Sequence, residues 1–98
     1  MVAKTLMWFV YLLRVQQSQA LYCGISNDLE ARIASHRKGT GAKYLRNKPF
    51  ELVWFMALEG RSLASKYEYQ IKRLPKKEKE RLVQNAPHPV HFDFSDQQ

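Results

Sequence analysis

The sequence predicts an α+β domain, in which a small three-stranded antiparallel sheet is flanked by helices in the order ββαβαα. Three apolar segments have the composition of strands, and only the short polar stretch QQSQ separates the first two. Two further segments place apolar residues at helical spacing. A chain of 98 residues builds one hydrophobic core. We therefore expect a single domain over residues 1–84, followed by a tail over residues 85–98.

The first strand is predicted over residues 6–15, which are almost continuously apolar and rich in aromatic and branched side chains. Such a composition is typical of a strand covered on both faces. Residues 20–25 form the second strand, and the short polar turn before them predicts a hairpin. The third strand, FELVWFMALE, covers residues 50–59 and has a long apolar middle.

The first helix is predicted to start after the second strand, in the segment SNDLEARIASHRKG. Asn27 can cap this helix, and Glu30 stands at the position that completes a capping box. Leu29 and Ile33 are expected to point to the core. The helix should end at Gly39, because glycine is the usual residue just beyond a helix C-terminus.

The second helix is predicted to be capped by Ser62. Apolar residues recur at helical spacing in this segment and define the expected buried stripe: Leu63, Tyr67, Ile71 and Leu74. Pro75 either ends this helix or opens a short charged helix over residues 75–84. The remainder has two prolines and no periodicity, and it reads as a tail.

The charge of the chain is strongly positive, with 16 Lys and Arg against 9 Asp and Glu and a net charge of +7. Such a balance favours a polyanionic partner. Residues 31–50 contain six basic residues and no acidic one. We expect five of the basic residues to bind nucleic-acid phosphates: Arg37, Lys38, Lys43, Arg46 and Lys48. A second basic run over residues 72–81 contains glutamates and is equally consistent with a solvated surface.

The cysteine content favours a reducing compartment. Cys23 is the sole cysteine and cannot form an internal disulfide, so we expect a cytoplasmic protein. Lys4 and the following apolar run resemble parts of a signal peptide, but short apolar runs beside turn residues are more often buried strands. Eight apolar residues are also too few to span a bilayer. No membrane partner is therefore expected.

Three polar positions are candidates for chemistry. Arg32 and His36 stand one helical turn apart, so they can reach one phosphate together or simply form the polar side of the helix. Glu68 can pair with Lys72 four residues later, or its carboxylate can hold a hard divalent cation. Composition alone does not choose between these alternatives.

The tail contains a further cluster of potential metal ligands: His88, His91 and Asp93. These residue types ligate transition metals. The segment contains prolines and offers no evident fourth ligand, so a chance cluster is the better interpretation.

Together these segments resemble a known family. The stretches FVY at 9–11, LYCG at 21–24 and NDLEARIASH at 27–36, with the glutamate of KYEYQIK, are similar to the GIY-YIG nuclease superfamily. The similarity is strongest to its small stand-alone bacterial members of the YhbQ type. It covers roughly residues 5–83, in the spacing and element order of the family.

The resemblance implies a metal-dependent endonuclease that hydrolyses phosphodiester bonds in DNA. It assigns five catalytic positions to this chain: Tyr11, Tyr22, Arg32, His36 and Glu68. Glu68 is the implied metal ligand, for Mg²⁺ or another divalent cation such as Mn²⁺. The alternative is a non-catalytic, basic nucleic-acid-binding module on the same fold, acting on DNA or RNA.

The resemblance also has departures and a chemical requirement. Phe9 replaces the first glycine of the family, at a position expected to pack, and Asn85 is only a loose match to its site asparagine. The two tyrosine hydroxyls can converge on the attacking water, one of them as general base. Tyrosine has an ordinary pKa of about 10, so a proton-accepting His36 or a cation would have to assist it.

Overall fold

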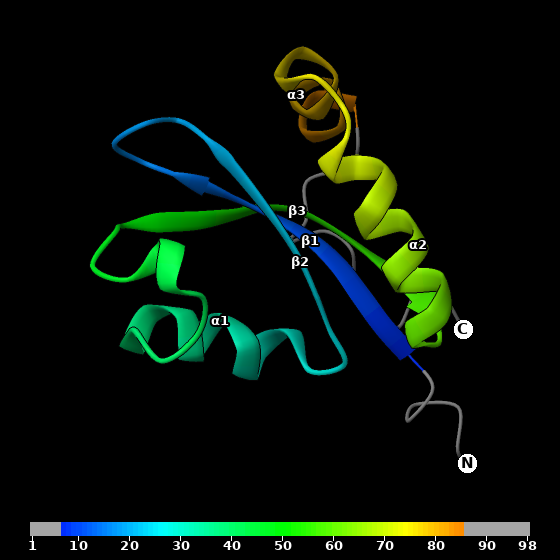
Figure 1. Ribbon diagram of the computed structural model, residues 1–98, viewed down its shortest axis with the longest axis horizontal. Coiled ribbons are helices and arrows are strands. Elements are labelled where there is room, and N and C mark those ends of the chain that lie inside the picture. Colours follow the sequence, from blue (N-terminus) through cyan, green and yellow to red (C-terminus); the bar gives the residue numbers. More distant parts are fainter. Residues whose placement is uncertain (1–6, 86–98) are drawn as a thin grey trace.

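The computed structural model describes residues 7–85, which form a three-stranded antiparallel sheet with helices on both faces (Figure 1). The strands are β1 (Met7–Val15), β2 (Leu21–Ser26) and β3 (Phe50–Glu59), and they pair in the order β2-β1-β3. The helices are α1 (Leu29–Lys38), the 3-10 turn η2 (Lys43–Leu45), α2 (Arg61–Lys72) and α3 (Lys76–Asn85). The predicted fold class and element order are confirmed, and β2 is an edge strand.

The central strand β1 is buried on both faces, as its continuous apolar sequence predicts. Tyr11, Leu13 and Val15 enter the core that α1 and η2 cover. Val10 and Leu12 point to the opposite face, which α2 and α3 cover. Because successive side chains of a strand alternate between faces, the sheet separates the protein into two layers of core.

The pairing of β1 with β3 contains one irregularity. Leu12 stands opposite Trp54, but Leu13 stands opposite Leu52, so Val53 is an extra residue in β3. Val53 and Trp54 consequently both pack on the α2 face of the sheet. Such a bulge bends the strand and increases the local twist.

The N-terminus of α1 differs from the sequence prediction by one residue. Asp28 caps the helix, and its Oδ1 atom accepts a hydrogen bond of 3.1 Å from the backbone N–H of Ala31. The predicted cap at Asn27, with its capping box to Glu30, is therefore wrong. Asp28 stands three residues before Ala31, which is the separation that a capping side chain spans. The predicted end of the helix at Gly39 is confirmed.

Two predictions for α2 are wrong, namely its N-terminal cap and one residue of its buried face. The helix begins at Arg61, after Gly60, so Ser62 lies inside the helix and does not cap it. Leu63 is 38% exposed, whereas Ala64 is fully buried. Ala64 and Ile71 are seven residues apart, about two helical turns, and so lie on the same face of the helix. The small alanine side chain lets α2 approach the sheet closely.

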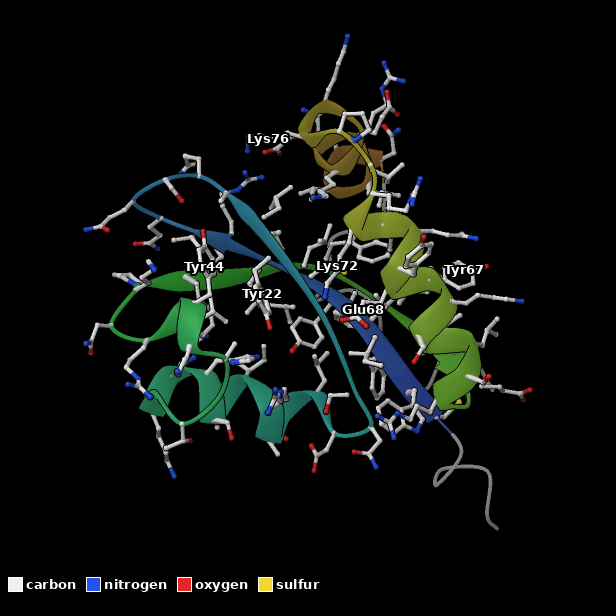
Figure 2. The ribbon with its side chains drawn as sticks, in the orientation of Figure 1. Tyr22, Tyr44, Tyr67, Glu68, Lys72 and Lys76 are labelled. Atoms are coloured by element: carbon white, nitrogen blue, oxygen red, sulfur yellow. The ribbon has the colours of Figure 1, made fainter. Side chains whose placement is uncertain are left out.

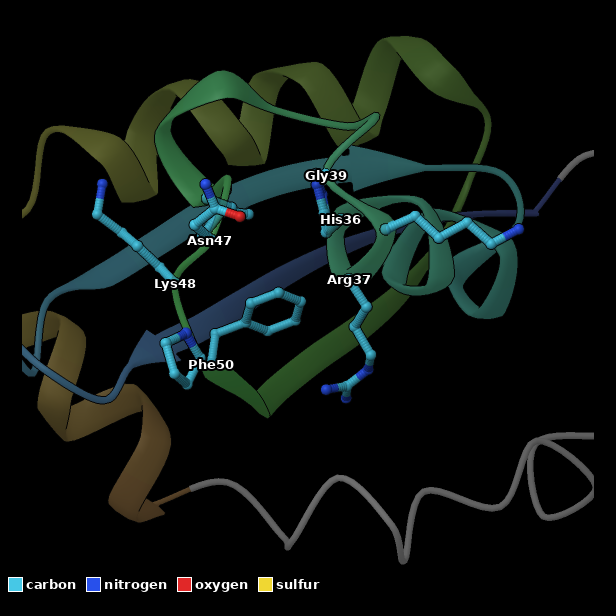
Figure 3. A pocket seen from close by; sticks show the side chains of 9 residues that line it. His36, Arg37, Gly39, Asn47, Lys48 and Phe50 are labelled. Atoms are coloured by element: carbon cyan, nitrogen blue, oxygen red, sulfur yellow. The ribbon is translucent and has the colours of Figure 1, made fainter.

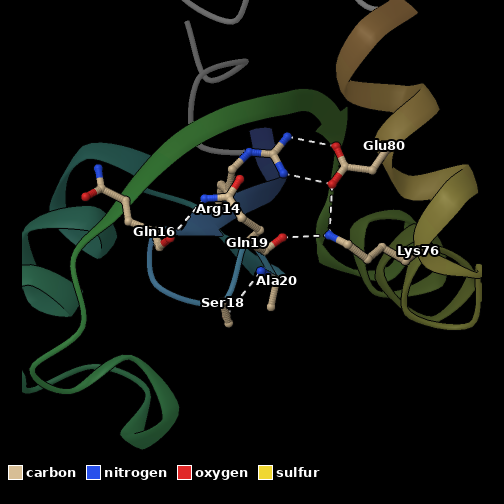
Figure 4. A network of polar contacts seen from close by, with 7 residues as sticks. All are labelled: Arg14, Gln16, Ser18, Gln19, Ala20, Lys76 and Glu80. Carbon is tan, nitrogen blue, oxygen red and sulfur yellow. Dashed lines mark hydrogen bonds and ion pairs between the residues drawn. The ribbon is translucent and has the colours of Figure 1, made fainter.

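Helix α3 buries no residue fully, but Leu82 and Val83 pack against the core, and polar contacts add to this attachment. Two hydrogen bonds of 2.8 Å join the guanidinium of Arg14 in β1 to the carboxylate of Glu80 (Figure 4). Lys76 donates to the same carboxylate at 2.9 Å and to the carbonyl of Gln19 at 2.6 Å. These contacts tie α3 to the β1–β2 hairpin.

Within residues 7–85, no helix combines the length and apolar character needed to cross a membrane.

Candidate active site

Tyr11 belongs to the central strand but its side chain lies across the edge strand. Its backbone pairs with Gly24 of β2, and a Cβ atom at Gly24 would overlap the phenol oxygen. The residue is 1% exposed. Gly24 therefore allows the hydroxyl of Tyr11 to approach the open edge of the sheet.

His36 is the buried partner of Tyr11. Its Nε2 atom lies 2.9 Å from the Tyr11 hydroxyl, and the backbone N–H of Ala42 donates a hydrogen bond of 3.2 Å to its Nδ1 atom. A Cβ atom at Gly41 would overlap Nδ1, so only glycine fits at that position. His36 is 1% exposed, which excludes the interpretation that it forms part of a solvated helix face.

Arg32 stands one turn before His36 on α1 and lies beside Tyr11. Burial raises the pKa of Tyr11 to about 12, and a hydrogen bond from Arg32 opposes that rise. Burial, followed by the positive charge of Arg32, lowers the pKa of His36. The structure therefore brings together three of the predicted residues, in an environment that keeps the phenol protonated and the imidazole neutral at pH 7.

Tyr22 packs on the outer side of this cluster. Its ring meets the His36 ring edge-on at a centroid distance of 5.8 Å, and it stacks on Tyr44 at 6.0 Å with an angle of 12°. Tyr44 is 45% exposed, and the ammonium of Lys48 lies 4.4 Å from its ring centroid. Tyr44 was not among the residues predicted for the site. Its aromatic character inside a basic, acid-free segment is the signal that could have found it.

Glu68 approaches from the other face of the sheet. It belongs to α2, and its carboxylate forms an ion pair of 3.2 Å with Lys72. In Figure 2, the β2 ribbon passes between Tyr22 and the Glu68–Lys72 pair. Burial, followed by the charge of Glu68, raises the pKa of Cys23 to about 12. Glu68 therefore flanks the same segment of β2, residues 22–24, from the face opposite to Tyr22.

The donor set at Glu68 fits a weakly held, hard cation. A carboxylate oxygen is the ligand that Mg²⁺ prefers, and Mg²⁺ usually keeps several waters and shares its coordination with substrate phosphates. Within the described part of the chain, no three His, Cys, Asp or Glu side chains form a metal-binding group. A closed protein cage is thus absent from residues 7–85. His88, His91 and Asp93, which the sequence indicates to be a chance cluster, lie outside the described residues.

Three of the five predicted phosphate-binding residues line one hollow at the C-terminal end of α1 (Figure 3). Arg37, Lys38 and Lys48 line it together with Phe50 and other residues, and its volume is about 290 Å³. The guanidinium of Arg37 lies 4.9 Å from the centroid of the Phe50 ring. No acidic side chain is among the described residues that line it.

The other two predicted phosphate-binding residues, Lys43 and Arg46, are exposed beside η2. Residues 43–45 form a 3-10 turn, and Leu45 is fully buried in the core. The basic side chains therefore project from a folded turn.

Phe9 and Asn85 are the two positions at which the sequence departs from the pattern of the GIY-YIG family, and both lie within the described residues. Phe9 packs against the core on the α1 side, where its ring meets Phe55 edge-on at 6.4 Å. It fills space, as expected. Asn85 is exposed at the end of α3 and lines a different hollow, with Leu74 and Leu82. That hollow does not contain Tyr11 or any other predicted catalytic residue.

Comparison with known proteins identifies relatives of this chain. A model of the GIY-YIG catalytic domain matches residues 7–81. A UPF0213 protein of Vibrio cholerae (El Tor Inaba N16961) is 55% identical over 78 residues, which cover 78% of this chain and 76% of the relative. The UPF0213 protein YhbQ of Escherichia coli (K12, DH10B) is 47% identical over 77 residues, with 78% and 76% covered.

Two solution NMR structures have the same fold. A UPF0213 protein from Bacillus halodurans superposes with a TM-score of 0.52 and 37% identity, over 80% of this chain and 83% of that chain. A protein from E. faecalis superposes with a TM-score of 0.57 and 33% identity, over the same shares. These neighbours support the ββαβαα topology.

Proposed function

Because the chain belongs to the GIY-YIG family, we propose that it is a divalent-metal-dependent endonuclease that hydrolyses phosphodiester bonds in DNA. The observation that carries this proposal is the convergence of Tyr11, His36 and Arg32 beside Gly24 at the open edge of the sheet. A buried phenol beside a guanidinium is a polar arrangement that a purely structural core does not need.

Arg32 is the group that contacts the scissile phosphate in this proposal. Its guanidinium offers a planar fork of donors, which matches two phosphate oxygens and stabilises the charge that develops on them. His36 holds Tyr11 in place through the hydrogen bond of 2.9 Å. Tyr22, at the rim of the cluster, is placed to orient the attacking water.

Glu68 would hold a Mg²⁺ or Mn²⁺ ion together with the substrate. When bound, such a cation polarises the phosphate and neutralises part of its charge. The carboxylate would bind the cation more readily if Lys72, whose ammonium lies 3.2 Å from its Oε2 atom, turned away. Lys72 is exposed, so its release requires no change in the core.

The basic residues around α1 and η2 would position the nucleic acid. We assign this role to Arg37, Lys38, Lys43, Arg46 and Lys48. Contacts of lysine and arginine with backbone phosphates neutralise charge and set the register, but they carry no sequence information. Cys23, a buried thiol, is compatible with action in the cytoplasm.

One observation favours a second candidate function, a basic binding module that does not cleave. Glu68 lies across the sheet from Tyr22 and is already paired with Lys72. If this pair never opens, the positive charge of Lys72 opposes the binding of a metal ion at this carboxylate. The same basic surface would then bind DNA or RNA without turnover.

Cleavage assays on a defined panel of substrates test the proposal. The panel contains single-stranded, duplex, branched and nicked DNA and single-stranded RNA, each with Mg²⁺, with Mn²⁺ and with EDTA. The proposed function requires metal-dependent cleavage of at least one DNA that Arg32→Ala, purified identically, does not cleave. Binding without cleavage under all conditions would support the binding module instead.

A further inference from the structure

The direction of the hydrogen bond between Tyr11 and His36 follows from the second partner of the histidine. A backbone N–H only donates, so the Nδ1 atom of His36 must accept from Ala42 and carry no proton. A neutral imidazole has one N–H, which then lies on Nε2. The Nε2–H group consequently donates to the phenol oxygen of Tyr11 at 2.9 Å.

The surroundings of His36 hold this tautomer in place. Moving the proton to Nδ1 would direct two N–H groups at each other, since Ala42 still points at that atom. Rotating the ring by half a turn would replace both nitrogens by carbons and leave Ala42 and Tyr11 without their partners. Each buried hydrogen bond lost in this way costs about 1–3 kcal/mol. The backbone of Gly41, packed against Nδ1, closes the remaining space.

Tyr11 therefore accepts a hydrogen bond from the Nε2–H of His36. The guanidinium of Arg32 also interacts with this phenol and lowers its pKa. The other titratable groups that face it in the described part of the chain are Tyr22 and Cys23, and no carboxylate is among them. Among the described residues of this cluster, none accepts the hydroxyl proton of Tyr11 in a hydrogen bond, so this proton remains available for transfer.

We propose that Tyr11 donates its proton to the leaving oxygen of the cleaved phosphodiester, and that His36 and Ala42 position it for this step. This role rests on the proposed endonuclease function. The bond between phosphorus and the leaving oxygen breaks, its electron pair stays on that oxygen, and the Tyr11 proton transfers there. Water supplies the new bond to phosphorus and gives its proton to the solvent. Solvent then returns a proton to Tyr11.

The two donors around Tyr11 suit a general acid. The bond from His36 strengthens when the phenol becomes a phenolate, and the positive charge of Arg32 attracts the phenolate, so both residues stabilise the charge as it forms. A pKa raised to about 12 keeps the group protonated before the reaction. Under this proposal His36 does not accept the proton of Tyr11, which was one of the two forms of assistance expected from the sequence, because its Nε2 atom is already a donor.

The tautomer is testable without catalysis. The protein labelled with ¹⁵N in its histidine rings has three residues to assign, His36, His88 and His91, and His36→Gln identifies the first. NMR spectra that correlate ring nitrogens with ring protons at pH 7 should give a protonated Nε2 and an unprotonated Nδ1 for His36. A protonated Nδ1 would overturn the inference.

The catalytic role is testable with a substituted leaving group. The best substrate from the cleavage panel is prepared with sulfur in place of the 3′ or the 5′ bridging oxygen, because a thiolate leaves without a proton. Tyr11→Phe should lose about 10²- to 10⁴-fold in kcat on the oxygen substrate and recover most of this on the matching sulfur substrate. Arg32→Lys, the control, should lose activity on both.

Three results are distinguishable. Equal losses of Tyr11→Phe on oxygen and sulfur substrates would overturn the role of proton donor while the endonuclease function stands. Recovery on one sulfur substrate supports the role and identifies which oxygen leaves. If the wild-type protein cleaves no substrate, the proposed function fails and the role of Tyr11 falls with it, and the NMR spectra still decide the hydrogen-bond directions.

Discussion

The phenol oxygen of Tyr11 lies 2.9 Å from the Nε2 atom of His36, although 25 residues separate the two along the chain. The central strand supplies one residue and α1 supplies the other. Their approach depends on two glycines, since a Cβ atom at Gly24 would overlap Tyr11 and one at Gly41 would overlap His36. Both glycines are therefore part of the candidate site.

Replacing Gly24 by alanine is expected to disable the site with only a moderate loss of stability. The new methyl group displaces the phenol, and a misplacement of about 1 Å can cost about 100-fold in rate. Overpacking should lower the free energy of unfolding by about 1–3 kcal/mol. Gly60→Ala is the control, because a Cβ atom at Gly60 would meet no other residue within 4 Å apart from its chain neighbours, and only the φ of 93° is unfavourable for alanine. Cleavage by Gly24→Ala at the rate of Gly60→Ala would contradict this role.

Much of the fold was predictable because hydrophobic patterns report burial directly. The unbroken apolar run of β1 indicated a strand covered on both faces, and β1 is the central strand. The helical stripe of α2 was predicted with one error, at Leu63, because Leu63 and Ala64 both fit the spacing from Ile71. Only packing against the sheet decides between them.

The site was less predictable, because its decisive contacts involve backbone groups and the choice of a sheet face. No sequence pattern reports that the N–H of Ala42 meets His36. Likewise, the stripe of α2 indicates that the helix covers a sheet but not which face it covers. The position of Glu68 across β2 from Tyr22 therefore required the structure.

The ion pair between Arg14 and Glu80 should make stability depend on pH below about 5. The hydrogen bond from Arg14 lowers the pKa of Glu80 from 4.5 to about 2 in the folded protein. Its contribution is thus fully present above pH 4.5 and is lost as the pH falls to about 2. For a partly exposed pair we expect about 1 kcal/mol.

Urea unfolding at pH 7, 4 and 2.5 measures this contribution on the wild-type protein and on Glu80→Gln. The difference between the two should shrink as the pH falls. Glu78→Gln is the matched control, because Glu78 pairs with Arg81 at 3.6 Å on an exposed surface. A difference that stays constant from pH 7 to pH 2.5 would refute the linkage.

Removing Lys43 and Arg46 together should weaken binding to all nucleic-acid sequences alike. Both side chains project from the folded turn η2, and a contact with backbone phosphate does not distinguish bases. The slope of log K against log salt should become less steep by about 2, one for each lost contact. Fluorescence anisotropy at several salt concentrations measures it. Lys66→Ala on α2 is the control, and a change in sequence preference would argue against this role.

Replacing Tyr44 by alanine is expected to lower cleavage because the ring of Tyr22 loses its stacking partner at 6.0 Å. Tyr44→Phe keeps the ring and should keep the activity. An aromatic pair contributes about 0.5–1.5 kcal/mol, so thermal melting should detect only a small loss of stability. The kcat values of Tyr44→Ala and Tyr44→Phe are compared to test whether the stacking positions Tyr22. Equal activity of the alanine and phenylalanine variants would show that the stacking does not position Tyr22.

Glu68→Gln separates the endonuclease from the binding module. Glutamine keeps the shape of the side chain but removes the charge that a hard cation requires, so metal-dependent cleavage should fall by roughly three orders of magnitude. Affinity for nucleic acid without metal should hold or rise slightly, since one negative charge is removed. Stability should change little, because an i,i+4 pair such as the one with Lys72 contributes about 0.3–0.5 kcal/mol. Mg²⁺ titration of cleavage and thermal melting are measured beside Glu78→Gln, which should behave as wild type. A glutamine variant that cleaves normally would mean that Glu68 only pairs with Lys72, and the metal would then need another ligand.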